Sequence, residues 1–368
     1  MGKDILKTEE GIRILFVSFQ IYPCKTGGTE VFNFHLADEL SRSNKVILYT
    51  YCDKTAGNAE LKTIRKGRPV KYLTPFKLFS YILKNRKDID VIFLSYMRSH
   101  WFRWTLFPII KKLFGIPYII TIHGGGLTPW KPFSLYRWAF VNADRLIGIS
   151  ERIKEEYQKR TGMDVKYIPP LFPFRKSEND QSEIKADFGL PPDSRVILYV
   201  GSLKKLKSPS TLLKAFDSLS ADFIAKHNLY LIFAGEGPKL DKLIQDSENP
   251  LRTKLMGNVP RERMPDLFKI SDLYVITSEF EGTPLSLLEA IFNMVPVIGS
   301  DVKGTNAIIE NGKNGLLYQF GNHLELSKGI RNLLENRELS RTYAVEAEKT
   351  YSERYSFQKV LESYQKIF

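Results

Sequence analysis

Residues 278–290 read SEFEGTPLSLLEA and place two carboxylates, Glu281 and Glu289, on either side of a glycine–proline turn. The strand-like run 273–277 precedes the turn and the helix-like run 285–292 follows it. We therefore expect Glu281 on a loop at the carboxyl end of a strand and Glu289 about one turn inside a helix. A helix N-terminus attracts anions, and nearby carboxylates can accept hydrogen bonds from sugar or ribose hydroxyls. The alternative is a surface glutamate and a helix glutamate that are both solvated and have no common function. The loops upstream in the sequence argue against this alternative.

The composition is that of an ordinary globular protein. A chain of 368 residues is long enough for two domains, and 43% of the residues are hydrophobic. We find no internal repeat, no apolar run of the roughly 18–20 residues that span a bilayer, and no signal-peptide pattern at the start. The two cysteines, Cys24 and Cys52, form no disulfide framework. We therefore expect a cytoplasmic protein.

The net charge of +13 is concentrated in the first half of the chain. Residues 61–140 hold 15 basic and 2 acidic side chains, and all four tryptophans lie in the same window. Basic residues interleaved with aromatic ones suit an anionic membrane surface or a nucleic acid. Buried aromatics beneath a solvated basic face are the structural alternative. The candidate interfacial segment is 99–114, which contains Trp101, Arg103, Trp104, Lys111 and Lys112.

Short apolar runs alternate with helix-length amphipathic runs in both halves, which predicts two parallel sheets covered by helices. Strands are expected at 13–19, 45–50, 70–73, 90–95, 118–122, 145–149 and 165–168, and then at 195–201, 230–234, 254–256, 273–277, 295–299 and 315–318. Helices are expected between them at 30–41, 77–86, 99–114, 135–142 and 151–160. The predicted organisation is an N-terminal domain at 1–175, a polar linker at 176–194, a C-terminal domain at 195–345 and a terminal helix at 346–368 that packs back on the N-terminal domain.

Open parallel sheets bind ligands at the carboxyl ends of their strands, so the loops there are functional candidates. The first strand is followed by Gly27 and Gly28, which would let the backbone approach a phosphate ahead of a helix. His123 follows another strand and begins the sequence HGGG. An esterase oxyanion loop has this pattern, but the chain contains no Gly-x-Ser-x-Gly nucleophile motif. Two roles for His123 therefore stay open. It could form a hydrogen bond with a sugar hydroxyl, or it could be a purely structural histidine.

Similar loops follow the strands of the second half. Gly201 and Ser202 precede Lys204, Lys205 and Lys207, whose ammonium groups could neutralise a diphosphate, with a solvated basic loop as the alternative for the first two lysines. Glycines after two further strands would let backbone groups pair with a nucleobase. These candidate residues are Gly235, Gly257, Asn258 and Val259.

Taken together, these loops resemble glycosyltransferase family 4, whose members are retaining enzymes of the GT-B fold. The resemblance covers nearly the whole chain, and its most specific element is the Glu–seven residues–Glu motif of Glu281 and Glu289. It implies that Glu281 and the adjacent amides hold the donor sugar and diphosphate, and that Glu289 binds the ribose. It further implies that Lys207 and the glycine loop contact the diphosphate and that His123 lies near the donor sugar. The implied nucleotide-sugar site comprises Gly27, Gly28, Gly201, Ser202, Lys207, Gly235, Gly257, Asn258, Val259, Gly282, Thr283, Pro284, Leu285 and Glu289, with Glu281, His123 and Lys207 as the catalytic residues.

Three departures from the family pattern stand out. Ser202 replaces the usual arginine, which removes one diphosphate contact that Lys204 or Lys205 could replace. Ser208 replaces the usual glycine after the lysine, and residues 168–171 replace the common Pro-Asn-Gly segment. The two glutamates are unaffected by these changes.

The resemblance implies retaining transfer of a hexose from a nucleotide-diphosphate sugar to a glycan or lipid-linked acceptor at an anionic membrane, in the synthesis of cell-surface polysaccharide, lipopolysaccharide, capsule or glycolipid. No metal ion or other cofactor is expected. Asp88-Ile-Asp90 matches a metal-binding Asp-x-Asp pattern only superficially, because it precedes a strand. The alternatives are a sugar-nucleotide epimerase or phosphorylase on the same fold, and a non-catalytic partner that binds sugar nucleotide or membrane. Nucleic-acid binding ranks last because the basic window contains no recognised motif.

Overall fold

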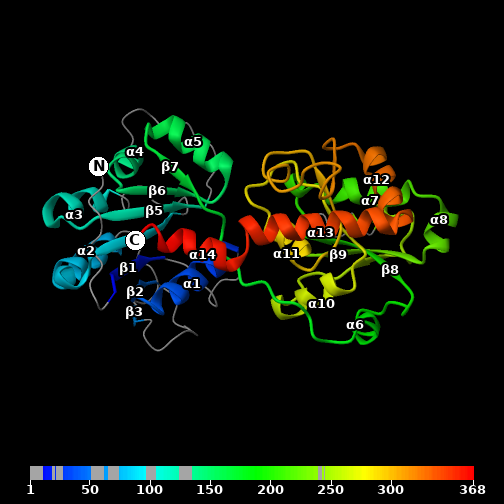
Figure 1. The fold of residues 1–368 in the computed structure, drawn as a ribbon, viewed down its shortest axis with the longest axis horizontal. Helices are drawn as coiled ribbons and strands as arrows, with labels where there is room; N and C mark the ends of the chain where they lie inside the picture. Colours follow the sequence, from blue (N-terminus) through cyan, green and yellow to red (C-terminus); the bar gives the residue numbers. More distant parts are fainter. Residues whose placement is uncertain are drawn as a thin grey trace. The chain divides into compact units, whose positions relative to one another are not determined.

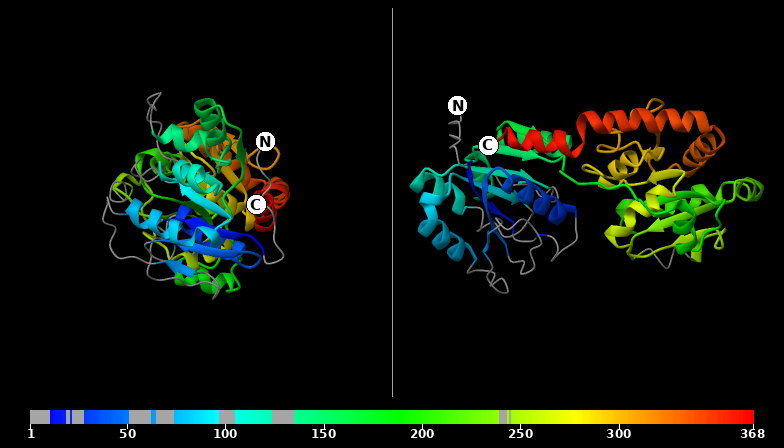
Figure 2. Two further views of the ribbon diagram at one scale, coloured as in Figure 1. Left: turned by 90° about the vertical axis from the view of Figure 1, so that its left-hand side faces the viewer. Right: turned by 60° about the horizontal axis from the view of Figure 1, so that its bottom comes forward.

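The computed structural model describes residues 11–18, 21, 28–50, 62–64, 74–96, 105–123, 135–238, 243 and 245–368. The chain forms two compact units, Met1–Pro173 with Phe357–Phe368, and Phe174–Ser356. Each unit is a parallel sheet covered by helices, as Figures 1 and 2 show. The predicted α/β class with two doubly wound domains is therefore confirmed.

The sheet of the first unit has the order β3-β2-β1-β4-β5-β6-β7, with parallel neighbours throughout. The strand order reverses between β1 and β4, which is the point where doubly wound sheets bind ligands. The strands are β1 (Arg13–Val17), β2 (Lys45–Tyr49), β3 (Lys62–Ile64), β4 (Val91–Tyr96), β5 (Tyr118–Ile122), β6 (Arg145–Gly148) and β7 (Val165–Tyr167).

Two layers of helices bury this sheet. The apolar faces of α1 (Gly28–Ser41) and α14 (Phe357–Gln365) cover one side. The other side is covered by α2 (Thr74–Asn85), α3 (Leu106–Phe114), α4 (Leu135–Val141) and α5 (Glu151–Thr161), with the 3₁₀ turn η1 (Arg86–Asp88) after α2. Because both faces are covered, the strands are near-continuous apolar runs rather than alternating ones.

The sheet of the second unit has the order β10-β9-β8-β11-β12-β13, again with parallel neighbours. Its strands are β8 (Arg195–Val200), β9 (Leu229–Ala234), β10 (Thr253–Leu255), β11 (Leu273–Ile276), β12 (Val297–Ser300) and β13 (Leu316–Tyr318). The order reverses between β8 and β11, so the loops after these two strands lie side by side at the carboxyl edge. Glu281 lies on the loop after β11, as predicted.

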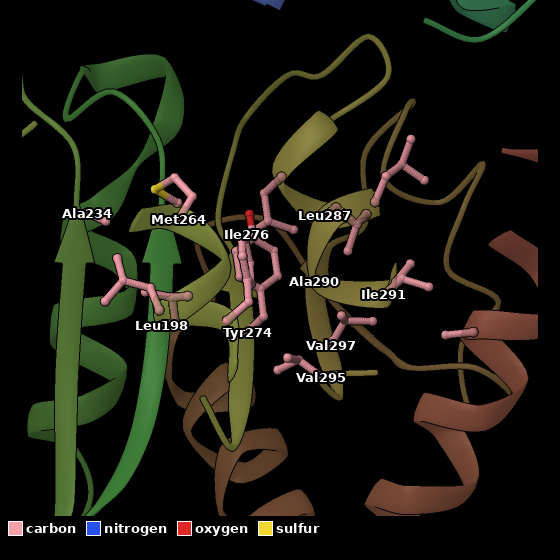
Figure 3. Packing of buried hydrophobic residues seen from close by; sticks show 14 of the residues in the cluster. Leu198, Ala234, Met264, Tyr274, Ile276, Leu287, Ala290, Ile291, Val295 and Val297 are labelled. Atoms are coloured by element: carbon pink, nitrogen blue, oxygen red, sulfur yellow. The ribbon is translucent and has the colours of Figure 1, made fainter. Parts of the chain in front are cut away.

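Helices cover both faces of the second sheet. One face packs against α6 (Gln181–Asp187), α10 (Met264–Lys269), α11 (Leu285–Phe292) and α13 (Arg337–Arg354), and Figure 3 shows part of this core around Tyr274 and Leu287. The other face packs against α7 (Pro209–Asp217), α8 (Ala221–Lys226) and α12 (His323–Glu335). The 3₁₀ turns η3 (Lys205–Lys207) and η4 (Arg261–Arg263) precede α7 and α10.

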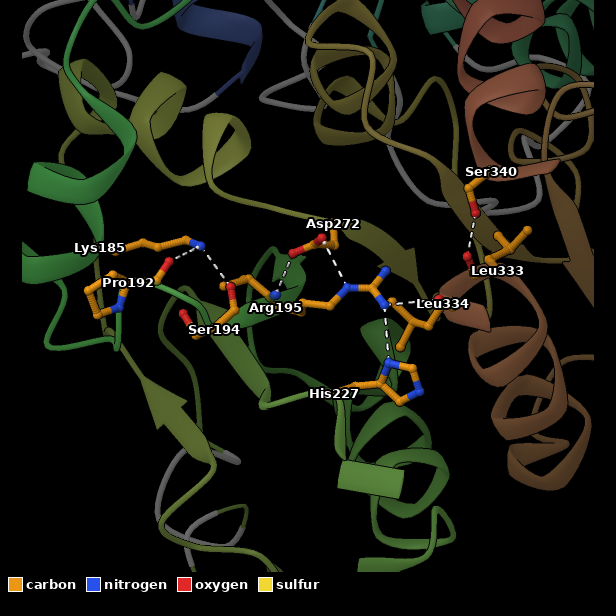
Figure 4. Close-up of polar contacts among 10 residues, drawn as sticks. Lys185, Pro192, Ser194, Arg195, His227, Asp272, Leu333, Leu334 and Ser340 are labelled. Carbon is orange, nitrogen blue, oxygen red and sulfur yellow. Dashed lines mark hydrogen bonds and ion pairs between the residues drawn. The ribbon is translucent and has the colours of Figure 1, made fainter. Parts of the chain in front are cut away.

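An arginine–aspartate pair closes the amino edge of each sheet. The Arg13 Nε donates to Asp90 Oδ2 at 3.0 Å, and the Arg195 Nε donates to Asp272 Oδ1 at 3.2 Å (Figure 4). In both units the aspartate also accepts a backbone N–H from the neighbouring strand. Asp90 therefore lies at the edge opposite to the ligand-binding loops, as its position before β4 predicts.

The predicted linker at 176–194 is partly helical. It contains α6, whose Ile184 is buried in the second core, and Lys185 donates to the carbonyl oxygens of Pro192 and Ser194 (Figure 4). The predicted boundary at 345 falls inside α13, because that helix runs unbroken to Arg354 with Tyr351 buried in the second core. The predicted strand 70–73 and the helical start 99–104 lie outside the described residues.

Candidate donor site in the second unit

The central loops of the second unit are joined by hydrogen bonds to backbone carbonyl groups. The Glu279 N–H donates to the Leu206 carbonyl at 2.9 Å, and the Thr277 hydroxyl donates to the Lys207 carbonyl at 2.8 Å. These contacts form because β8 and β11 are parallel neighbours, so their carboxyl ends meet at one edge. The loop that carries Lys207 is thereby held against the loop that carries Glu281.

Lys207 and Glu281 form an ion pair, with 2.5 Å between Nζ and Oε1. The Ser278 hydroxyl also donates to Glu281 Oε1, at 2.6 Å, and the Ser300 hydroxyl donates to the Ser278 carbonyl. Glu281 is buried, whereas a third of the Lys207 side chain remains exposed. The ammonium group is therefore positioned by a buried carboxylate and stays accessible to an anionic ligand.

Ser208, which follows Lys207, has a φ of +45°. This left-handed conformation favours glycine, which explains why the glycine of the family pattern suits the position. The strained residue ends η3 and precedes Pro209, the first residue of α7. Ser202, Lys204 and Lys205 lie on the same loop, and both of these lysines are exposed.

The predicted glycines at neighbouring strand ends lie together. A Cβ on Gly235 would lie 2.0 Å from the Gly201 carbonyl oxygen, so the two backbones approach more closely than any other residue permits. The Gly235 N–H donates to the Gly257 carbonyl at 2.7 Å. Asn258 is exposed and Val259 is half-buried beside them. The loops after β8, β9 and β10 therefore form a continuous backbone surface.

Glu289 is the second buried carboxylate of the site. Its Oε2 lies 3.6 Å from the Arg261 Nη2 on η4, and no other cation among the described residues lies within ion-pair distance of it. Burial raises the pKa of the Glu289 carboxyl from 4.5 to about 7, and Arg261 opposes this rise. The two glutamates differ in how their negative charge is compensated. Glu281 has a cation and a hydroxyl donor in direct contact, whereas Glu289 has a more distant arginine.

The turn between the two glutamates is fixed by a residue that sequence reasoning missed. A Cβ on Gly304 would lie 2.5 Å from the Gly282 carbonyl oxygen and 2.6 Å from that of Glu281, and Gly304 has a φ of +101°. The turn continues through Thr283 and Pro284, and α11 begins at Leu285. Its first N–H groups have no intrahelical acceptor and can face an anion.

Arg261 and Ser278 are the other residues that sequence reasoning missed. Arg261 belongs to no recognisable motif, and Ser278 opens the stretch 278–290 but is neither of its two glutamates. Each of the two residues is identified by its contact with a glutamate. Only a weak signal in the sequence pointed to Gly304: it is a glycine that lies shortly after a predicted strand and before a turn. Its role depends on the neighbouring loop, which the local sequence does not specify.

In the first unit, Gly28 and His123 lie at the carboxyl edge of the sheet. Gly28 opens α1, and the ring of Phe32 in α1 lies 4.8 Å from the His123 ring, centroid to centroid. Both ring nitrogens of His123 are buried without a hydrogen-bond partner in the described part of the chain. Burial lowers the pKa of His123 to about 3, so the imidazole is neutral at physiological pH. Gly27 lies outside the described residues.

The structure describes only two of the five candidate membrane residues. Trp101, Arg103 and Trp104 lie outside the described residues. Lys111 forms an ion pair with Asp144 at 2.8 Å, so it stabilises the attachment of α3, whereas Lys112 is exposed. No helix in the described ranges combines the length and apolar character that a membrane crossing requires. Within the same ranges, no three His, Cys, Asp or Glu side chains gather as a metal site would require.

A cavity of about 470 Å³ lies farther along the same edge, at the ends of β12 and β13. Asp301 and Glu325 line it together with Tyr318 and Phe320. None of the predicted site residues lines this cavity, and its two carboxylates would repel a diphosphate. The ion-paired loops after β8 and β11 remain the candidate site.

Two doubly wound domains form the GT-B fold of glycosyltransferases, and in this chain the second domain carries Glu281 on the loop after β11 and Glu289 in α11. The sequence model described as Glycosyltransferase Family 4 matches residues 26–172, and the model described as Glycosyl transferases group 1 matches residues 180–350. The two matches together account for most of the chain. The chain belongs to glycosyltransferase family 4.

Similar proteins fit this assignment. The putative teichuronic acid biosynthesis glycosyltransferase TuaC of Bacillus subtilis is 28% identical over 67% of this chain and 66% of its own length. An Escherichia coli UDP-Gal:alpha-D-GlcNAc-diphosphoundecaprenol alpha-1,3-galactosyltransferase is 28% identical over 57% of this chain and 58% of its own length. The crystal structure of Anabaena Alr3699/HepE in complex with UDP has a TM-score of 0.78 and 18% identity, and the match covers 97% of this chain and 99% of that one. The structural likeness shows a shared fold.

Replacing Gly304 by alanine should disrupt the turn that carries Glu281, because the new Cβ would collide with two carbonyl oxygens. We expect a loss of unfolding free energy of about 3 kcal/mol or more, measured by urea denaturation. The control is Gly312→Ala, which also has a positive φ (+77°) but no atom within 4 Å of the new Cβ. It should lose only the backbone strain of about 1 kcal/mol. Equal losses in the two variants would contradict the proposed contact.

Replacing Glu289 by glutamine should stabilise the ligand-free protein at neutral and alkaline pH. The unfolded chain releases this proton near pH 4.5, whereas the folded protein retains it to about pH 7. The wild type therefore loses up to about 3 kcal/mol of stability as the pH rises through this window, and the variant does not. Urea denaturation from pH 4 to pH 8 measures the difference. The control is Glu279→Gln, at an exposed position of the loop after β11. If the stability difference between Glu289→Gln and the wild type stayed constant with pH, it would contradict the burial effect.

Proposed function

We propose that this protein is a retaining hexosyltransferase that moves a sugar from a nucleotide-diphosphate sugar to a hydroxyl of a glycan or lipid-linked acceptor. The observation that carries the proposal is the Lys207–Glu281 pair at the strand-order reversal of the second sheet. A buried carboxylate suits sugar hydroxyls, and an accessible ammonium group beside it suits a diphosphate. Alr3699/HepE, which shares the fold, was crystallised with UDP and with UDP-glucose, which supports a nucleotide-sugar donor.

Each part of the donor has a proposed partner in this chain. The diphosphate is bound by Lys207 and by the amides of the Gly282–Leu285 turn. The donor sugar is bound by Glu281. The ribose is bound by Glu289, and the nucleobase lies on the backbone of the loops that contain Gly201, Gly235 and Gly257 to Val259.

In the proposed mechanism, the bond between the sugar and the diphosphate breaks while the acceptor hydroxyl attacks from the same face. The leaving diphosphate takes the proton of that hydroxyl. Lys207 and the first amides of α11 stabilise the developing negative charge, and positive groups that are already in place at a developing anion supply much of the rate enhancement in such sites. We propose that these groups suffice without a metal ion, so that transfer persists in EDTA.

The surface of the first unit supports the proposed acceptor class. The exposed large apolar side chains described there, Phe76, Leu83, Ile109, Leu113 and Trp138, all lie on α2, α3 and α4. Exposed lysines at positions 77, 84 and 112 lie on α2 and α3. Apolar and cationic groups on one helical layer suit an anionic membrane surface. We propose that the protein attaches peripherally to the cytoplasmic face of a membrane. There it would meet a lipid-linked acceptor of cell-surface polysaccharide or glycolipid synthesis. The names of two similar proteins support this proposal: TuaC is named for teichuronic acid biosynthesis, and the E. coli galactosyltransferase is named for a diphosphoundecaprenol acceptor.

Replacing Glu281 by alanine should reduce sugar transfer by about 10²- to 10³-fold, because the donor sugar loses its carboxylate and Lys207 loses its positioning partner. A thermal-shift panel of nucleotide sugars identifies the donor, and transfer of its labelled sugar to a membrane extract measures activity. Glu279→Gln, on the exposed side of the same loop, should retain activity. Near-normal transfer by the alanine variant would defeat the proposal. Sugar release without an acceptor would favour an epimerase or phosphorylase instead.

Replacing Phe76 and Leu113 by serine should weaken binding to liposomes that contain anionic lipid, because these side chains are 62% and 61% exposed on the apolar layer. Flotation with anionic and neutral liposomes measures the effect, and we expect about a tenfold loss for the double variant. Leu251→Ser removes an 89% exposed leucine from the second unit and should leave binding unchanged. Negligible binding of the wild type to both liposome types would refute membrane attachment.

A further inference from the structure

Arg261 lies between two parts of the proposed donor site. It opens η4, directly after the loop that contains Gly257 to Val259, and its Nη2 is 3.6 Å from Oε2 of Glu289 on α11. The glycine pattern gives that loop a role and the resemblance to family 4 gives Glu289 a role, and neither gives a role to Arg261. Arg261 therefore joins the proposed nucleobase loop to the proposed ribose carboxylate.

The two partners differ strongly in exposure. The Glu289 side chain is 5% exposed and that of Arg261 is 41% exposed. Among the described residues, the other ionisable groups that interact with Glu289 are the phenols of Tyr274 in β11 and Tyr351 in α13. Burial raises the pKa values of both, so both stay neutral. A carboxylate in such surroundings stays ionised only with a cation nearby. Within the described residues, Arg261 is the cation that the geometry supplies.

The separation of 3.6 Å is itself informative. The Lys207–Glu281 pair is in direct contact at 2.5 Å, and Arg263 on the same turn approaches Asp266 to 2.8 Å. Arg261 stands farther from its partner, beyond normal hydrogen-bond distance. It therefore stabilises the negative charge of Glu289 without occupying the lone pairs of the carboxylate, which remain available to two hydroxyl donors.

We propose that Arg261 is a positioning residue of the donor site: it holds Glu289 as an oriented carboxylate that accepts hydrogen bonds from the ribose hydroxyls of the nucleotide. The proposal rests on the proposed function and extends it with a specificity determinant. An ionised carboxylate accepts hydrogen bonds from both ribose hydroxyls, whereas a protonated one competes as a donor. Selection of ribonucleotide over deoxyribonucleotide donors then depends on Arg261.

The test is calorimetric binding of UDP-glucose, or of GDP-mannose if the panel favours it, between pH 5.5 and 8.5. The diphosphate diester of these ligands does not titrate in this range. For the wild type, affinity should fall as the pH drops and Glu289 is protonated. Removing the cation in Arg261→Gln should move the midpoint of this fall upward by about one pH unit. Affinity at pH 7 should then drop up to about tenfold and recover toward pH 8.5.

Two variants control the experiment. Arg261→Lys keeps the charge and should restore the wild-type midpoint. Arg263→Gln removes an equally exposed arginine from the same turn, whose partners are Asp187 and Asp266, and should leave the midpoint unchanged. If the glutamine variant fails to fold, Arg261→Met, which retains the aliphatic stem, replaces it. The 2′-deoxyribose form of the ligand should bind less tightly than the ribose form to the wild type, and the two should converge in Arg261→Gln at pH 7.

Two results would overturn the proposal. A uniform loss of affinity at every pH, with an unchanged midpoint, would mean that Arg261 contacts the ligand directly. An unchanged affinity and midpoint would mean that Arg261 has no role in the donor site. If no nucleotide sugar binds the wild type, the proposed function itself fails together with this extension. The pH profile thus separates failure of the Arg261 role from failure of the donor site.

Discussion

The ion pair between Lys207 and Glu281 is the interaction on which the candidate site depends. It forms only because β8 and β11 are parallel neighbours, so that two loops 74 residues apart in sequence end at the same edge. Hydrogen bonds from the Thr277 hydroxyl and the Glu279 backbone N–H then hold the loops together. A charge pair at this position places an accessible cation where a doubly wound sheet binds its ligands.

The two buried carboxylates illustrate a conflict between stability and binding. Glu281 has its negative charge compensated by a lysine in contact and by the Ser278 hydroxyl. Glu289 is buried with a more distant cation, and burial raises its pKa to about 7. A buried carboxyl whose charge is only partly compensated destabilises a ligand-free protein at neutral pH. Its retention is understandable if a ligand with hydroxyl donors completes its surroundings.

The helix that carries Glu289 also anchors the ends of the second unit. Phe292, in the last turn of α11, packs against Phe174, the first residue of the unit, at 5.9 Å between ring centroids. It also packs against Tyr351, in the last turn of α13, at 5.6 Å. Both chain crossings between the units therefore begin beside the same helix. Helix α11 therefore carries Glu289 and also contacts the segments where the chain enters and leaves this unit.

The local sequence was sufficient for the alternation of strands and helices and for the positions of Glu281 and Glu289, because apolar periodicity and a glycine–proline turn are short-range signals. It was insufficient for Arg261, which acts on a glutamate 28 positions away, and for Gly304, whose missing Cβ makes room for another loop. It also represented residues 176–194 as a linker, although Ile184 is buried in the second core. These features depend on which strands become neighbours and on which loops then meet. Strand order arises from the packing of the whole sheet, so only the tertiary structure decided them.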